Sequence, residues 1–344
     1  MRMLVSILVP FLALLGACSE NGFSRRRVSD EFLQAPSNQV DILWVIDNSV
    51  SMQNEQENVA LGAADFMAQL ETTAMDFHLG VISSDMSLGN TEKAVLLGNP
   101  PVLDNTVQYQ SLFESRVRLG TGGDDQESGL EAAITAIEGP LSYTRNEGFL
   151  RAGAMLNIVM VSDENDCSDY GALGPDSTGE ECYTQYDKLV PVADLVRRIK
   201  EIKGDDPVVM SGIVGPDIVD NCENTVPGRR YYTAIEMLGG VREDICQTEY
   251  STVMNALGQV ASGILTVFTL SSAAVEDTIE VTVTPDGGAP AAVARDEVNG
   301  WTYDAQYAQV TFHGTGVPPR GATIEISYEV AAGVTVAEDT ATTP

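Results

Sequence analysis

The chain has 344 residues, which is enough for two domains or for one large domain with an appendage. Its 50 acidic residues against 19 basic ones give a formal net charge of −31, which argues strongly against nucleic acid as a partner, since phosphate binding needs a basic face. Hydrophobic residues make up 44% of the chain, which is ample for a folded core and argues against global disorder.

Residues 1–17 have the pattern of a signal peptide. Arg2 precedes an apolar stretch, 4–15, that is too short to serve as a stable membrane span. The following Leu15-Gly16-Ala17-Cys18 resembles the bacterial lipobox, which implies that Cys18 carries a lipid. By the same resemblance, Ser19 favours the outer membrane of a bacterial cell envelope. An ordinary secreted protein that happens to have Cys18 is the alternative.

Residues 18–38 are polar and irregular, so we expect a tether between the lipid and the folded domain. The arginines at 25–27 either lie against anionic headgroups or are simply solvated.

A continuous apolar run, 40–46, ends in a cluster of oxygen donors. Its short, β-branched composition indicates a buried strand of a parallel sheet. Asp47, Ser49 and Ser51 follow at alternate positions, which can bring one carboxylate and two hydroxyls to a common point. Hard oxygen donors suit Mg²⁺, with Mn²⁺ or Ca²⁺ as alternatives. A strand-to-helix turn capped by a serine is the other interpretation.

At these three residues the chain resembles the von Willebrand factor A family, whose metal-ion-dependent adhesion site has the pattern Asp-x-Ser-x-Ser. The resemblance implies two further loops that complete a metal site. It also implies that a carboxylate from a protein partner fills an open position on the metal.

The second loop of the resemblance is the Gly-rich stretch 119–130, which precedes a predicted helix over 130–137. The family's threonine position is matched imperfectly, because the one threonine lies too early when positions are counted back from Gly129. The candidates for the fourth metal ligand are Thr121, Asp124 and Asp125. Glu127 is expected to cap the following helix through its backbone amides.

The third loop follows another apolar run, 156–161, and Asp163 holds the position of the family's aspartate there. Asp166 is a candidate for an extra contact. Acidic, oxygen-rich segments that follow three apolar strands are the pattern expected at a switch point of an open α/β sheet. The carboxylates of Asp47 and Asp163 would balance one divalent ion.

Strand and helix patterns alternate over 40–270 and predict a doubly wound, mostly parallel sheet, which we assign to residues 39–272. The predicted strands are 40–46, 77–82, 93–97, 156–161, 208–214 and 264–270, of which the last closes the sheet. The predicted helices are 55–73, 112–117, 130–137, 189–202, 231–238 and 249–263.

Four cysteines remain after Cys18, and an even number in an exported chain predicts two disulfides. Of three possible pairings, we expect the sequence-local one, Cys167–Cys182 and Cys222–Cys246. The first would fasten a polar insertion, 168–184, beside the metal-site loops. Zinc is a poor alternative, because the chain has no Cys-x-x-Cys and only two histidines.

Strict alternation of apolar and polar residues appears after residue 275 and predicts a small antiparallel β module at 273–331, with a disordered tail at 332–344. The expected function is therefore that of an envelope-anchored protein that binds a protein or extracellular partner through the metal. A structural or assembly lipoprotein, in which the metal only stabilises the loops, is the alternative. A hydrolase is disfavoured, because its general base would have to be a carboxylate such as Glu164.

Overall fold

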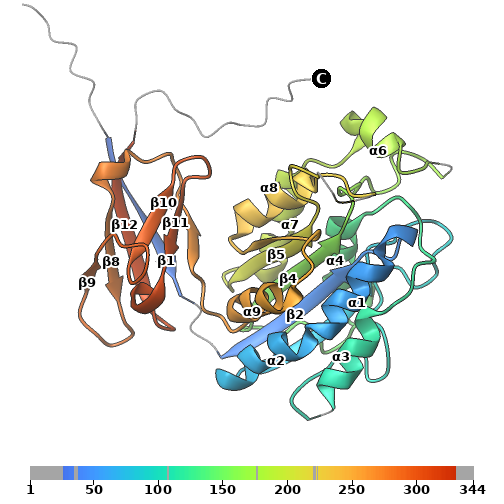
Figure 1. The fold of residues 1–344 in the computed structure, drawn as a ribbon, viewed down its shortest axis with the longest axis horizontal. Coiled ribbons are helices and arrows are strands. Elements are labelled where there is room, and N and C mark those ends of the chain that lie inside the picture. Colours follow the sequence, from blue (N-terminus) through green and yellow to red (C-terminus); the bar gives the residue numbers. More distant parts are fainter. Residues whose placement is uncertain are drawn as a thin grey trace, which may run out of the picture.

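The computed structural model describes residues 26–34, 38–106, 108–175, 177–219, 222 and 224–330. The predicted signal peptide, Cys18 and the predicted tail lie outside these residues. The described chain forms an α/β domain and a separate β module beside it (Figure 1). No helix within the described ranges is both long enough and apolar enough to cross a membrane.

The α/β domain is built on a five-stranded parallel sheet, which confirms the predicted fold class. In spatial order its strands are β3 (Asp76–Ser83), β2 (Gln39–Ile46), β4 (Met155–Ser162), β5 (Val208–Val214) and β6 (Arg242–Asp244). All eight residues of β4 are buried, as expected for a strand covered on both faces.

Helices cover both faces of this sheet (Figure 1). One face packs against α1 (Gln53–Leu61), α2 (Ala63–Thr72), α3 (Tyr109–Val117) and α9 (Tyr250–Ala261). The other packs against α4 (Gly129–Ile137), α7 (Val192–Lys203) and α8 (Arg229–Leu238). Shorter helical turns are Val50–Met52, Gly139–Ser142, α6 (Glu181–Thr184), Tyr186–Lys188, Glu276–Thr278 and Gly314–Gly316.

The first face of the core is centred on Trp44, whose ring lies 5.2 Å from that of Phe66 and 5.1 Å from that of Phe113. The single helix predicted over 55–73 is instead two helices that meet at Gly62. A Cβ atom at Gly62 would lie 2.5 Å from Met254 Cγ, so glycine lets α9 pack closely at this break.

The β module consists of two antiparallel sheets around a core of their inward-facing residues. One sheet has the order β1 (Arg26–Leu33), β12 (Thr323–Val330), β8 (Glu280–Thr284) and β9 (Ala291–Val293). The other has the order β10 (Trp301–Asp304), β11 (Gln309–Phe312) and β7 (Val267–Thr269).

Two of these strands differ from the sequence prediction. Residues 26–33, expected in a tether, form β1 and pair with β12 over their full length, because Val28 and Phe32 alternate onto the module core. The run 264–270 does not close the parallel sheet, since β7 pairs with β11 and β6 occupies the edge. Residues 93–97 form the end of a turn and an irregular segment, and no strand.

The two parts are joined at Gln34, whose side chain is fully buried between the connecting segments. Its Nε2 donates to the carbonyls of Leu265 (2.9 Å) and Pro318 (3.0 Å), and its Oε1 accepts from the N–H of Leu265 (3.0 Å). The segment that enters β2 is thereby bonded to the segment that leaves α9.

Both predicted disulfides, Cys167–Cys182 and Cys222–Cys246, are present.

Candidate functional site

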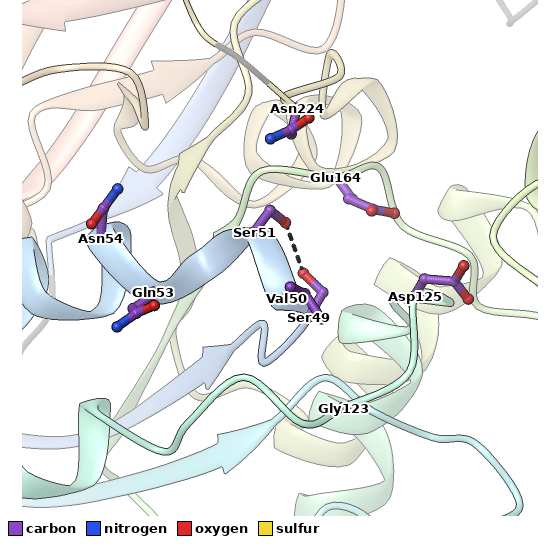
Figure 2. A pocket seen from close by; sticks show the side chains of 9 residues that line it. All are labelled: Ser49, Val50, Ser51, Gln53, Asn54, Gly123, Asp125, Glu164 and Asn224. Carbon is purple, nitrogen blue, oxygen red and sulfur yellow. Dashed lines mark hydrogen bonds between the residues drawn. The ribbon is translucent and has the colours of Figure 1, made fainter.

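Three loops meet at the carboxyl ends of β2 and β4, where the chain changes from one side of the sheet to the other. The N–H of Asp47 donates to Val161 O (2.9 Å), and the N–H of Gly123 donates to Asn48 O (2.9 Å). A Cβ atom at Gly123 would lie 2.4 Å from Asn48 Oδ1, so this close approach requires glycine. Figure 2 shows the loop of Gly123 beside the turn that follows β2.

Asp47 is fully buried, and both of its carboxylate oxygens accept hydrogen bonds from the protein. Oδ1 accepts from the N–H of Ser49 (2.7 Å), and Oδ2 accepts from the hydroxyl of Ser162 (2.6 Å). The hydroxyls of Ser49 and Ser51 lie 3.1 Å apart (Figure 2). The structure therefore brings the carboxylate and the two hydroxyls of the Asp-x-Ser-x-Ser turn together.

Asp163 joins this group from the end of β4 and is only 2% exposed. Burial, followed by the negative charge of Asp47, raises the pKa of the Asp163 carboxyl to about 7. The same two causes raise the pKa of the neighbouring Glu164 to about 8. Each of these carboxyls therefore holds its proton to a higher pH than an exposed carboxyl does.

The second loop contacts Asp47 through Glu127, which the sequence analysis expected to cap the following helix instead. Glu127 is 1% exposed; its side chain lies beside Asp47 and accepts a hydrogen bond from the hydroxyl of Ser84. Helix α4 begins after Ser128 without a side-chain cap, so the expected capping role of Glu127 was wrong. Burial and the charge of Asp47 raise the pKa of Glu127.

The three candidate ligands of that loop lie further out. Thr121 is partly exposed, and Asp124 accepts a hydrogen bond from the N–H of Gln126 (3.1 Å). Asp125 is exposed and accepts from the N–H of Gly179 (3.3 Å) in the insertion.

The predicted divalent cation, Mg²⁺ with Mn²⁺ or Ca²⁺ as alternatives, is not supported by this arrangement. In the part of the chain that the structure describes, no group of three or more His, Cys, Asp or Glu side chains could hold a metal ion. Burial raises the pKa of the carboxyls of both Asp47 and Glu127. The oxygens of Asp47 accept hydrogen bonds from the N–H of Ser49 and the hydroxyl of Ser162, and the expectation of a metal cofactor was wrong.

Asp166, named as a candidate for an extra contact, has a different partner. It accepts hydrogen bonds from the N–H of Leu130 (3.0 Å) and the hydroxyl of Ser168 (2.7 Å). Its Oδ2 also lies 3.0 Å from both Nε and Nη2 of Arg230, in an ion pair that is almost completely buried. This pair fixes the third loop to the start of α4 and to α8.

A cavity of about 540 Å³ lies between the loops. It is lined by Ser49, Val50, Ser51, Gln53, Asn54, Gly123, Asp125, Glu164 and Asn224 (Figure 2). The loop between β5 and α8 contributes one of these residues, Asn224, which the sequence analysis did not single out.

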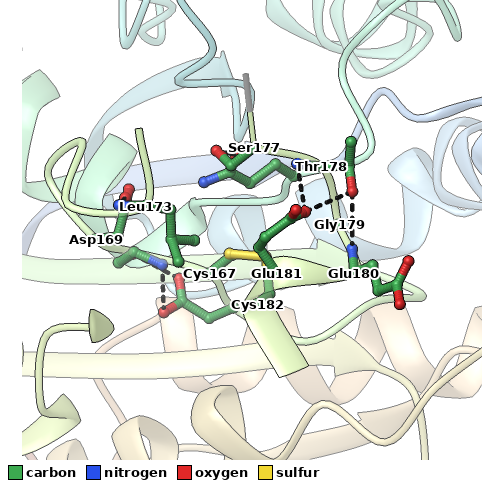
Figure 3. Close-up of a disulfide and its surroundings, with 12 residues drawn as sticks. Cys167, Asp169, Leu173, Ser177, Thr178, Gly179, Glu180, Glu181 and Cys182 are labelled. Atoms are coloured by element: carbon green, nitrogen blue, oxygen red, sulfur yellow. Dashed lines mark hydrogen bonds between the residues drawn. A yellow bond between two sulfur atoms is a disulfide. The ribbon is translucent and has the colours of Figure 1, made fainter. Parts of the chain in front are cut away.

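The insertion after β4 borders this cavity and is held by its disulfide (Figure 3). The N–H of buried Cys167 donates to Glu127 O (2.6 Å), which fixes one end of the insertion to the second loop. At the other end, Gly179 approaches Asp125 so closely that an added Cβ would lie 2.7 Å from its carbonyl oxygen.

Both histidines of the chain lie away from the cavity lining. His78 Nδ1 is 3.2 Å from Phe149 O, and His313 Nε2 is 2.8 Å from Thr302 Oγ1 in the β module. Neither serine of the Asp-x-Ser-x-Ser turn has a histidine beside it, so the turn lacks the base that activates a serine nucleophile.

No family model and no curated protein matches the sequence. Among solved structures, the chain is similar to the pilus adhesin SpaC from Lactobacillus rhamnosus GG, with a TM-score of 0.44 and 12% identity over 88% of this chain and 41% of SpaC. It is also similar to the pilus adhesin RrgA from Streptococcus pneumoniae, with a TM-score of 0.35 and 9% identity over 88% of this chain and 58% of RrgA. For proximal thread matrix protein 1 from the mussel byssus, the TM-score is 0.36 and the identity 13%, over 69% and 50% of the two chains.

The chain thus spans less than half the length of SpaC. Similarities at these TM-scores assign neither a family nor a function.

The raised pKa values of Asp163 and Glu164 predict that stability falls as pH rises. The folded chain keeps these protons up to about pH 7 and about pH 8, whereas the ordinary pKa values are 3.8 and 4.5. The free energy of unfolding therefore decreases from about pH 4 to about pH 8. Above that range, Glu164→Gln should be more stable than the parent by about 1–3 kcal/mol, because glutamine carries no charge into the buried position.

Urea denaturation at about pH 5 and about pH 8.5 measures this difference. Glu147→Gln removes the same charge from an exposed position and should change stability by less than about 0.5 kcal/mol at either pH. An unchanged pH dependence in Glu164→Gln would contradict the prediction.

Proposed function

We propose that this protein is a surface-exposed, adhesin-type binding protein without enzymatic activity. Its binding face consists of the loops that follow β2, β4 and β5, together with the Gly-rich loop before α4. The observation that carries the proposal is the convergence of these loops around one polar cavity at the switch point of the sheet, which is where open α/β sheets bind their ligands.

Two further features support binding on the outside of a cell. The two disulfides are typical of chains that fold outside the reducing cytosol. Val50, on the rim of the cavity, is 79% exposed, which leaves an apolar side chain available for contact with a partner.

We also propose that a lipid on Cys18 anchors the protein to the bacterial outer membrane. The lipobox-like sequence before Cys18 supports this part of the proposal. A partner that presents a carboxylate is not part of it. That expectation depended on the cation, and the negative charge of the exposed Asp125 would repel such a partner.

The test is attachment of beads coated with the purified chain to a panel of immobilised extracellular proteins and glycans. Val50→Glu, which adds a charge to the rim, should reduce attachment at least about tenfold. Val298→Glu, an exposed apolar position in the β module (69% exposed), should not change it. Equal attachment by both variants, or attachment of the parent to no surface, would refute the proposed face.

A further inference from the structure

We propose that the cavity binds an uncharged carbohydrate, so that the partner of the proposed binding face is a neutral glycan. This inference rests on the proposed function and specifies its ligand. It is carried by the chemical groups that line the cavity, in a protein whose overall charge alone would suggest a cationic ligand.

The lining offers hydrogen-bond donors as well as acceptors. Its donors are the hydroxyls of Ser49 and Ser51 and the side-chain amides of Gln53, Asn54 and Asn224. Its strongest acceptor is the carboxylate of Asp125, whereas the carboxyl of Glu164, whose pKa is raised to about 8, both donates and accepts. Among the described residues, the three amide side chains make no hydrogen bond to protein and all three residues are exposed, so their donors are available to a ligand.

This mixture discriminates between classes of ligand. An ammonium or guanidinium group only donates, so it could bond to the oxygens of these hydroxyl, amide and carboxyl groups but to none of their O–H and N–H donors. A carboxylate or phosphate only accepts, so it could bond to the donors of the lining but not to its oxygens, and the negative charge of Asp125 would repel it. A sugar hydroxyl both donates and accepts, and it can therefore satisfy both sets, which matters because an unpaired desolvated polar group costs about 1–3 kcal/mol.

The size and the rim of the cavity agree with this ligand. About 540 Å³ lies within the range of ~300–1,000 Å³ that is typical of small-molecule sites. Val50 supplies apolar contact for the C–H face of a sugar ring.

The shape of the cavity is also set before a ligand arrives. Gly123 is packed against Asn48, and the loops that carry Glu164 and Asn224 are each adjacent to a disulfide. A site fixed in this way orders few side chains on binding, which lowers the entropic cost of holding a weakly binding sugar.

The experiment is a binding screen of the purified full chain against neutral glycans, sialylated glycans, and peptides rich in lysine and arginine. Asn224 has a backbone φ of 61°, which an alanine would strain, so the amide donors are removed at the start of α1 instead. The double variant Gln53→Ala/Asn54→Ala should weaken glycan binding about tenfold. Gln110→Ala on α3, an exposed amide outside the cavity, is the matched control and should bind as the parent does.

The variant Asp125→Asn distinguishes a neutral sugar from a cation as the ligand of the cavity. Asparagine keeps one acceptor oxygen and loses the charge, so neutral-glycan binding should fall less than about threefold, whereas binding of a cation would be largely lost. Neutral-glycan binding should also be nearly constant between ~50 and ~500 mM salt, because no net charge is screened.

Retention of basic peptides alone, with steep salt dependence and loss on Asp125→Asn, would overturn the carbohydrate assignment. Attachment to proteins alone would overturn it as well, while leaving the proposed binding face intact. Retention of none of these probes by a folded parent chain would overturn both.

Discussion

Replacing Arg230 with alanine is expected to lower the free energy of unfolding by about 3–5 kcal/mol, because it leaves the charge of Asp166 buried without a partner. The Asp166 side chain is 0% exposed, and that of Arg230 is 3% exposed. Arg230 also donates through Nη2 to Val190 O (2.7 Å), so its loss frees a second, partly buried acceptor.

Urea denaturation monitored by circular dichroism measures this effect. The double variant Asp166→Asn/Arg230→Met removes both charges and should recover much of the lost stability. Arg197→Ala breaks exposed ion pairs with Asp194 and Glu201 and should cost less than about 1 kcal/mol. A loss below about 1 kcal/mol for Arg230→Ala would show that the buried pair does not hold the third loop.

The parallel sheet could be predicted because its strands are short apolar runs separated by amphipathic helices. Strand β4, which is buried along its whole length, is the clearest of them. The strand over 26–33 could not be predicted, because arginines obscure its alternation of apolar and polar residues. Its partner β12 also lies almost three hundred positions away in the sequence. The run that forms β7 is as apolar as a closing strand of the parallel sheet, so composition alone could not place it in the module.

The site, too, contains some residues that the sequence could predict and others that it could not. Asp47 and Asp163 follow adjacent parallel strands, so topology alone brings them together. Glu127 was missed because its approach to Asp47 depends on how the Gly-rich loop folds, which a motif does not encode. Its position directly before the apolar start of α4 was the available signal of burial. Asn224 comes from a loop without any motif.

The second large effect is expected from the disulfides, since both fasten loops that border the cavity. Cys167–Cys182 closes a 15-residue separation and Cys222–Cys246 a 24-residue one. Restricting the unfolded chain over such loops is worth about 3 kcal/mol each, so Cys167→Ser/Cys182→Ser and Cys222→Ser/Cys246→Ser should each lose about that much stability.

The two variants should differ in how they affect binding, and this difference tests the role of the loops. Without Cys222–Cys246, the loop of Asn224 loses its covalent link to the segment after β6, so the cavity loses one wall. Without Cys167–Cys182, the hydrogen bond from Cys167 N–H to Glu127 O still holds one end of the insertion. The hydrogen bond from Gly179 N–H to Asp125, at the other end, remains only while the insertion stays folded. Denaturation measures the stability of each variant, and the glycan screen measures binding below its unfolding transition. Binding that survives in both variants under those conditions would mean that hydrogen bonds alone set the shape of the cavity.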